Sequence, residues 1–457
     1  MLTIKSYYLM KKLIYLLIIF STTLIACSDD DCLNVKQSNI ETPNVLSQSE
    51  QAILKSISRR HKVTSRFDCI NMLPYIVKGD TVAFIVNYED GWEIYASDMR
   101  LPMMIMRSES GNFYPTQLNE GEPVYDYFFN IASNIKNLRE SGDLRNTEVD
   151  PSWMAYLPND DENLSRSKDW HEVASGGSSS TKEYTPLGGR LKTKWDQVYP
   201  YNQYTKKVLN PQNVKVNAPT GCSAVGIGQY LFWMHETYGV PKYCPTQATE
   251  KGDIYEYSDF KDGWSDLYSP TYSSATMNKV SIFLGYLATK MNAEFKWNET
   301  GVDNSVYSGF IKEQTGRTVS KTTGSTTSIA EQLKQGKPVI CSSKIINNGR
   351  HTYLIDYYKE IFDVTYVYYA YTDPSDGDDE EEDPFADVDN PSLEELEAYY
   401  GEIRTNSYYH TSYWYRMNWG WGGNGDNVEV SAYYNPMSVN INNVTYKIET
   451  PTIFYTN

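Results

Sequence analysis

A glycine–cysteine pair at the start of a predicted helix is the feature that most restricts how this chain can fold and react. The segment Ala-Pro-Thr-Gly-Cys-Ser-Ala-Val at 218–225 is a proline-containing turn followed by an apolar run, which predicts a helix from Cys222 to about His235. The first N–H groups of a helix lack partners within it, and the helix dipole favours a negative charge there. A thiol at this position therefore has a lowered pKa, and its thiolate is a nucleophile.

Few histidines are available to act as the base for this thiol. His351 follows a glycine-containing turn and leads into an apolar, strand-like run, so it can face a cleft at the start of that strand. His235 lies about 20 Å along the same predicted helix as Cys222, which is too far for a contact. The other histidines are His61 and His171, which fall in other predicted units, and His410, which remains the rival base.

Two further segments carry the polar groups that a thiol nucleophile requires around it. Gln197 lies 25 residues before Cys222, and its amide, with the Cys222 backbone N–H, could stabilise an oxygen that becomes negative during the reaction. Asn418 and Trp419 open the segment Asn-Trp-Gly-Trp-Gly-Gly, where an amide beside an indole could orient the imidazole of His351. Taken singly, these segments also have ordinary structural interpretations, as a loop glutamine and as a glycine-rich bend with tryptophans in the core.

The order of predicted elements in the second half of the chain indicates an α+β fold. Helical patterns come first and strand patterns follow, which favours a helical part combined with an antiparallel sheet. The predicted helices are 222–236, 275–292 and 327–335, and the predicted strands are 338–342, 351–358, 364–371, 408–418, 427–432 and 444–448.

A smaller α+β unit is predicted at 46–140, ahead of the larger unit at 187–457. It contains a hairpin signal, because an Asp-Gly turn at 90–91 separates two strand-like runs. Between the two units, residues 141–186 are polar and include a Ser/Gly-rich run. This composition is typical of an exposed linker that is easily cut, so we expect an activation site there.

The N-terminus predicts an export signal with a lipid anchor. Two lysines precede a short apolar run, so residues 1–26 fit a signal peptide better than a membrane-spanning helix. The run ends in Leu-Ile-Ala-Cys, which resembles a bacterial lipoprotein signal whose Cys27 becomes the lipidated first residue; an ordinary secretory signal is the alternative. A polar tether follows at 27–45. Its acidic start predicts a lipoprotein of the outer membrane or cell surface, from which a mature catalytic part could be secreted.

The charge and cysteine pattern exclude several classes of partner. The net charge is −17, but residues 373–402 hold 14 Asp and Glu with no Lys or Arg, and the rest of the chain carries only −3. We therefore interpret that insert as a solvated loop, with calcium binding as a weaker alternative, and expect no nucleic-acid partner. The six cysteines include no Cys-x-x-Cys pair, and we expect no metal site and no cofactor.

Four motifs, in this order, resemble the streptopain family of papain-like cysteine peptidases. They are Trp-Asp-Gln with Pro-Tyr-Asn at 195–202, Thr-Gly-Cys with a helix at 220–235, His with apolar residues and Ile-Asp at 351–356, and Asn-Trp-Gly-Trp-Gly-Gly at 418–423. The last motif is highly specific, and the resemblance covers roughly 187–457. The unit at 46–140 also resembles the family's propeptide, which blocks the cleft until proteolysis removes it.

The resemblance implies a role for each candidate residue. Cys222 and His351 form the catalytic dyad of a papain-like unit with two subdomains, Gln197 helps to build the oxyanion hole, and Asn418 and Trp419 flank the imidazole. The substrates would be proteins, and an apolar pocket would take the substrate residue second from the scissile bond on its N-terminal side. The chain's own propeptide would act as its inhibitor.

Three features depart from the family pattern. Arg350 stands where the family has a small residue before the histidine, and a cation there would disfavour the imidazolium. Tyr357 replaces a glycine, and the insert at 373–402 lengthens the connection between His351 and Asn418. The departures concern activity more than fold.

The leading hypothesis is therefore an exported, lipid-anchored cysteine endopeptidase that is made as a zymogen and cleaves proteins through a thioester. A non-catalytic surface binding lipoprotein on the same fold is the main alternative, which Arg350 and the 40 tyrosines favour. A cell-wall amidase of the related Cys–His type is a third hypothesis. The Asn-Trp-Gly-Trp-Gly-Gly segment and the propeptide-like unit favour the peptidase over both.

Overall fold

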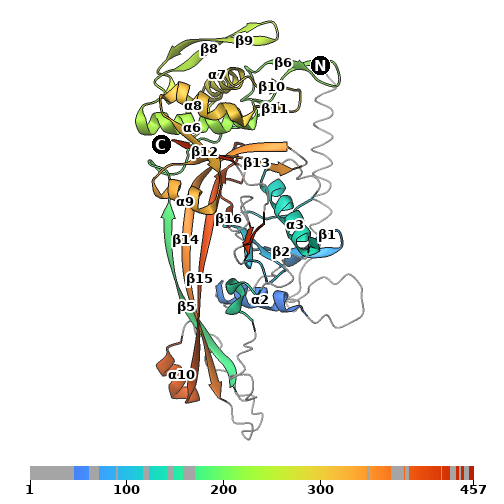
Figure 1. Cartoon of the computed structure of the whole chain (residues 1–457), viewed down its shortest axis with the longest axis vertical. Coiled ribbons are helices and arrows are strands. Elements are labelled where there is room, and N and C mark those ends of the chain that lie inside the picture. Colours follow the sequence, from blue (N-terminus) through green and yellow to red (C-terminus); the bar gives the residue numbers. More distant parts are fainter. Residues whose placement is uncertain are drawn as a thin grey trace.

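A computed structural model gives the structure of the chain (Figure 1). It describes residues 46–60, 71–88, 91–116, 123–141, 148–157, 170–346, 349–371, 385, 391–423, 425–432, 439–441, 444–446 and 452–456. No helix in these ranges has the length and apolar character needed to cross a membrane. The predicted signal peptide, the tether with Cys27, and most of the acidic insert lie outside the described residues.

One long antiparallel sheet runs through both predicted units (Figure 1). Its strands are β1 Asn71–Val77, β2 Asp80–Asn87, β3 Trp92–Ala96, β4 Met104–Ser108, β5 Trp170–Tyr184, β12 Val319–Thr323, β13 Val339–Ile346, β14 Gly349–Tyr371, β15 Ile403–Asn418, β16 Glu429–Ser431 and β19 Thr452–Thr456. They follow the order β1-β2-β3-β4-β16-β15-β14-β13-β19-β12, and β5 pairs with β14. Short two-stranded pairs lie outside this sheet: β6 Lys207–Leu209 with β7 Lys215–Asn217, β8 Cys244–Lys251 with β9 Ile254–Lys261, β10 Glu294–Phe295 with β11 Thr300–Gly301, and β17 Val439–Ile441 with β18 Val444–Tyr446.

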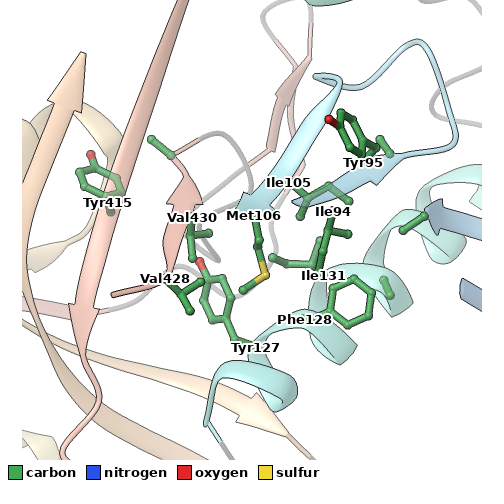
Figure 2. Packing of buried hydrophobic residues seen from close by; sticks show 14 of the residues in the cluster. Ile94, Tyr95, Ile105, Met106, Tyr127, Phe128, Ile131, Tyr415, Val428 and Val430 are labelled. Atoms are coloured by element: carbon green, nitrogen blue, oxygen red, sulfur yellow. The ribbon is translucent and has the colours of Figure 1, made fainter. Parts of the chain in front are cut away.

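The first unit contains the predicted hairpin, formed by β2 and β3. Its helices are α2 Gln48–Arg60 and α3 Pro123–Ser141, and α4 Pro151–Met154 follows in the predicted linker. Helix α3 packs on the sheet through an apolar face. Figure 2 shows the buried side chains at this contact: Tyr127, Phe128 and Ile131 of α3 with Ile94 of β3, Ile105 and Met106 of β4, Val430 of β16, and Val428 just before β16.

The second unit has a helical part and a sheet part, so the predicted α+β class is confirmed. Its helices are α6 Cys222–Tyr238, α7 Ser274–Lys290, α8 Tyr307–Thr315 and α9 Thr326–Lys334, with short 3-10 turns η2 Trp264–Leu267 and η3 Asn304–Val306. Helix α6 is buried along most of its length, as its apolar sequence on all sides requires. The sequence predicted α6, α7 and α9 but missed α8.

A three-stranded arm of β5, β14 and β15 extends from the body of the molecule and carries α10 Leu393–Tyr400 near its end (Figure 1). The sequence predicted two strands at 351–358 and 364–371, but β14 is one strand of 23 residues, because β15 and β5 pair with it across the intervening residues.

The arm also revises the predicted linker. Residues 170–184 were expected to be irregular from their Ser/Gly composition, but they form β5, which pairs with β14 along its length. Backbone groups make this pairing, so small polar side chains can take part in it. The boundaries of the propeptide, linker and peptidase units remain predictions.

The sheets of the two units join where β4 pairs with β16, and Arg107 lies opposite Glu429 there. The Glu429 carboxylate is buried and forms ion pairs with Arg107, Lys359 and Arg416 at 2.6–2.7 Å. Burial alone would raise the pKa of Glu429, but the cations of Arg107 and Lys359 lower it to about 2. Glu429 thus connects the two units through charge as well as through backbone pairing.

We expect Glu429→Gln to destabilise the full chain at pH 7 by about 3 kcal/mol or more, because three cations lose their buried counter-charge. A carboxyl whose pKa is lowered in the folded state stabilises the fold above its unfolded pKa. The difference between the two proteins should therefore shrink as the pH falls below about 4. Denaturant unfolding at several pH values measures this difference.

Glu250→Gln is the matched control, because Glu250 forms an ion pair with Lys207 at the surface. It should change the unfolding free energy very little. Equal losses in the two variants would contradict the connecting role of Glu429.

Candidate active site

Cys222 is the first residue of α6, where the sequence placed it. Gly221 caps the helix with φ of 85°, and no side chain caps the first turn. A Cβ atom at Gly221 would lie 2.6 Å from the Thr300 carbonyl oxygen, so only glycine fits this approach to the helix. The uncapped turn leaves backbone N–H groups near the thiol.

The imidazole of His351, near the start of β14, lies beside the Cys222 thiol. Burial would raise the pKa of the thiol, but the charge of His351 and hydrogen bonds from His351 and Thr352 lower it to about 7. Burial would lower the pKa of His351, but the Cys222 thiolate and its hydrogen bond raise it. Both shifts favour a thiolate–imidazolium pair.

The backbone carbonyl of Trp419 orients this imidazole. His351 Nε2 lies 3.0 Å from the Trp419 oxygen, so Nδ1 is the nitrogen that remains for the thiol. The Trp419 ring stacks near the imidazole, with 6.4 Å between ring centroids, and it is buried. The indole thus covers one side of the pair and limits the access of water.

Asn418 does not supply the orienting amide that the sequence suggested. Its Oδ1 accepts hydrogen bonds from Gln229 at 2.9 Å and from the Gly420 N–H at 3.2 Å, and its Nδ2 donates to the Thr193 carbonyl at 3.0 Å. Asn418 instead fixes the segment that precedes Trp419. The orienting contact comes from a backbone carbonyl, which every residue has, and so the residue types could not identify it.

Gln197 lies next to the turn that leads to Cys222. Its backbone carbonyl accepts the Thr220 N–H at 2.8 Å, and its own N–H donates to Asp196 Oδ1 at 2.6 Å. Among the described residues, its side-chain amide has no hydrogen-bond partner. The amide is therefore available for a substrate oxygen.

Arg350 and His410 do not take part in the pair. Arg350 is exposed, and His351 has a raised pKa in spite of this neighbouring cation. His410 lies opposite Asp363 on the arm, about 40 Å along β14 from His351. Burial lowers the pKa of His410, which leaves it neutral near pH 7. The rival base predicted from the sequence is thus remote from Cys222.

The sequence missed a buried hydroxyl cluster beneath the thiol. The Tyr307 hydroxyl lies 2.5 Å from Ser223 Oγ and 2.8 Å from Thr352 Oγ1, so α8 is tied both to the start of α6 and to β14. Since Tyr307 comes from a helix far from both in the chain, no local signal could reveal this contact.

Helix α3 of the first unit lies against the same site. The Tyr127 ring contacts the Trp419 ring edge to face, with 5.4 Å between centroids, and a Cβ atom at Gly425 would lie 3.1 Å from Val124. Asp126, between these two α3 residues, is buried and contributes to the raised pKa of His351. A carboxylate of the first unit thus acts on the imidazole of the second.

Comparisons with known proteins concern the segment that contains Cys222 and His351. Residues 195–372 match the family model described as the Peptidase C10 family. The resemblance to the streptopain family is thereby confirmed for this segment of the chain. Among solved structures, the chain is similar to a fragment of a mutant prointerpain A from Prevotella intermedia, with 16% identity, a TM-score of 0.47 and coverage of 85% of this chain and 98% of that chain. No curated protein matches the chain.

His351→Ala should raise the pKa of the Cys222 thiol, because burial remains while the lowering charge and hydrogen bond are lost. The thiolate fraction at pH 7 then falls, and alkylation of Cys222 by iodoacetamide should slow by about tenfold. His410→Ala is the control and should leave this rate unchanged. Equal slowing in both variants would contradict the pairing.

Gly221→Ala and Gly239→Ala test the fit of the helix start. Both glycines flank α6 with positive φ, but a Cβ at Gly239 meets nothing within 4 Å. Gly239→Ala should cost about 1–2 kcal/mol in unfolding free energy from its left-handed backbone alone. Gly221→Ala should cost more, because it also forces Thr300 to move. Similar losses in denaturant unfolding would contradict the close contact.

Proposed function

We propose that the chain is the zymogen of an exported, lipid-anchored cysteine endopeptidase that acts through Cys222 and His351. The observation that carries this proposal is the thiol at the uncapped start of α6 in contact with an imidazole that raises its acidity. The match of residues 195–372 to the model of a peptidase family supports the same reaction class. The substrates would be proteins, and no cofactor is required.

The proposed reaction uses the pair in two stages. The Cys222 thiolate attacks the scissile carbonyl carbon, and the resulting oxyanion takes hydrogen bonds from the Cys222 backbone N–H and the Gln197 amide. His351 then gives its proton to the leaving amine as the C–N bond breaks, which leaves a thioester on Cys222. A water molecule that loses a proton to His351 attacks the thioester, which releases the acid product and restores the Cys222 thiolate beside the protonated imidazole.

The first unit is proposed to inhibit the enzyme until it is removed. Helix α3 contacts Trp419 beside the imidazole, and this position supports an inhibitory role for the predicted propeptide at 46–140.

The position of β5 narrows the proposed activation site within 141–186. Because β5 pairs with β14 along 170–184, a protease would reach the chain more readily before Trp170. The segment after β5 is held by the second unit. The Leu187 N–H donates to the Gly336 carbonyl at 2.7 Å, and the Leu187 carbonyl accepts the indole N–H of Trp233 at 3.0 Å. We therefore propose that β5 stays with the mature enzyme.

Export and anchoring complete the proposal. Lipid on Cys27 would hold the precursor at the outer membrane or cell surface. A cut before Trp170 would then separate the catalytic part from its anchor and release it. Lipid that remained on the catalytic fragment after activation would contradict this order of events.

The direct test compares the soluble chain from Ser28 with its Cys222→Ala variant under mild reducing conditions. We expect the wild type to shorten to a fragment that begins before Trp170 and to cleave casein, while the variant stays intact and inactive. Cys244→Ala is the matched control, because the Cys244 thiol is buried and has a pKa raised to about 11; it should behave as the wild type.

Other outcomes would select the alternative functions. If the wild type stays intact, we would cleave the linker with an added protease and repeat the casein assay. Continued inactivity would contradict the peptidase and favour a surface binding lipoprotein. Hydrolysis of peptidoglycan in place of casein would favour a cell-wall amidase.

A further inference from the structure

Asp426 is a buried carboxyl group whose hydrogen bond reaches the residue that orients the imidazole. It lies in the loop between the Asn-Trp-Gly-Trp-Gly-Gly segment and β16, and it is 9% exposed. Its Oδ1 accepts the backbone N–H of Trp419 at 3.2 Å. The carbonyl of the same Trp419 lies 3.0 Å from His351 Nε2. Both backbone polar groups of Trp419 are thus engaged, one by Asp426 and one by His351.

The loop around Asp426 is itself anchored. Arg190 Nη2 donates to the Asp426 backbone carbonyl at 2.8 Å and to Asp356 Oδ1 at 3.0 Å. The second Asp356 oxygen accepts the Leu191 N–H at 2.9 Å. Arg190 therefore connects this loop to β14 a few residues beyond His351, and the position of Asp426 relative to the imidazole is held from two sides.

The charged groups around Asp426 are Arg190, Lys194 and Asp356. Burial and the Asp356 charge raise the pKa of Asp426 to about 7, against the lowering effects of the Trp419 N–H and the two cations. An Oδ1 atom can accept the Trp419 N–H whether or not the carboxyl group carries a proton. The hydrogen bond, unlike the charge, is thus available on both sides of neutral pH.

We propose that Asp426 is a positioning residue for the imidazole of His351, which it holds through Trp419. The proposal rests on the proposed function of the Cys222–His351 pair. A buried N–H without a partner is costly, so loss of the Asp426 acceptor would lead the Trp419 backbone to seek another one. The Trp419 carbonyl would then leave His351 Nε2, and the imidazole would lose the contact that turns Nδ1 toward the thiol.

Two substitutions separate this role from a general effect on stability. Asp426→Asn keeps an oxygen acceptor of the same shape and removes the charge, whereas Asp426→Ala removes the acceptor. Asp253→Asn is the control, because Asp253 forms an exposed ion pair with Lys215 far from this loop in the chain. All three are made in the full chain from Ser28, and their folded fractions are measured by denaturant unfolding.

The readout is the rate of Cys222 alkylation by iodoacetamide between pH 5 and 9, expressed per folded molecule and corrected with Cys222→Ala. We expect Asp426→Ala to slow alkylation at pH 7 by about tenfold and to shift its midpoint to higher pH. Asp426→Asn and Asp253→Asn should follow the wild-type profile. A role limited to stability would change the folded fraction and leave the profile of the folded protein unaltered.

Two results would overturn the proposal. The first is that folded Asp426→Ala shows the wild-type dependence of Cys222 alkylation on pH. The second is that alkylation slows equally in Asp426→Asn and Asp426→Ala, which would assign the effect to the lost charge. Casein hydrolysis by the wild type, measured in parallel, tests the proposed function separately. An altered profile in Asp426→Ala without any casein hydrolysis would support the positioning role and contradict the peptidase.

Discussion

The contact between the Cys222 thiol and the His351 imidazole determines the charge state of both groups in the candidate active site. Each partner comes from a different part of the second unit, the thiol from the start of α6 and the imidazole from the start of β14. Without its partner each group would be neutral at pH 7, because burial raises the pKa of the thiol and lowers the pKa of the imidazole. Their proximity offsets that cost, and the Trp419 carbonyl holds the geometry in which it can do so.

The first unit is joined to the second by a common β-sheet and by ion pairs. Pairing of β4 with β16 continues one sheet across the two units. Glu429 forms ion pairs with Arg107 of the first unit and Lys359 of the second. The same unit places Asp126 and Tyr127 of α3 against the site. The first unit is thus part of the fold of the full chain, and in the proposed activation its removal would expose both the site and the edge of the sheet at β16.

Local patterns in the sequence predicted the thiol and the imidazole that the structure brings together. Cys222 is marked by a turn and an apolar helix, and His351 by a turn and an apolar strand, so both positions were visible without tertiary structure. The sequence did not predict the contacts of the Trp419 carbonyl, Asp426 and Asp126, because these contacts arise from packing between segments distant in the chain. Strand β5 was missed because its Ser/Gly composition resembles a linker, whereas its pairing with β14 depends on backbone groups.

The most direct measurement of the central claim is an ultraviolet titration of the thiolate in the full chain, with Cys222→Ser as the reference. The difference between the two proteins isolates the ionisation of Cys222. A midpoint near pH 7 is expected, because His351 stabilises the thiolate against the effect of burial. A midpoint at or above about 8.5, the ordinary value for a thiol, would show that the two groups do not form an ion pair.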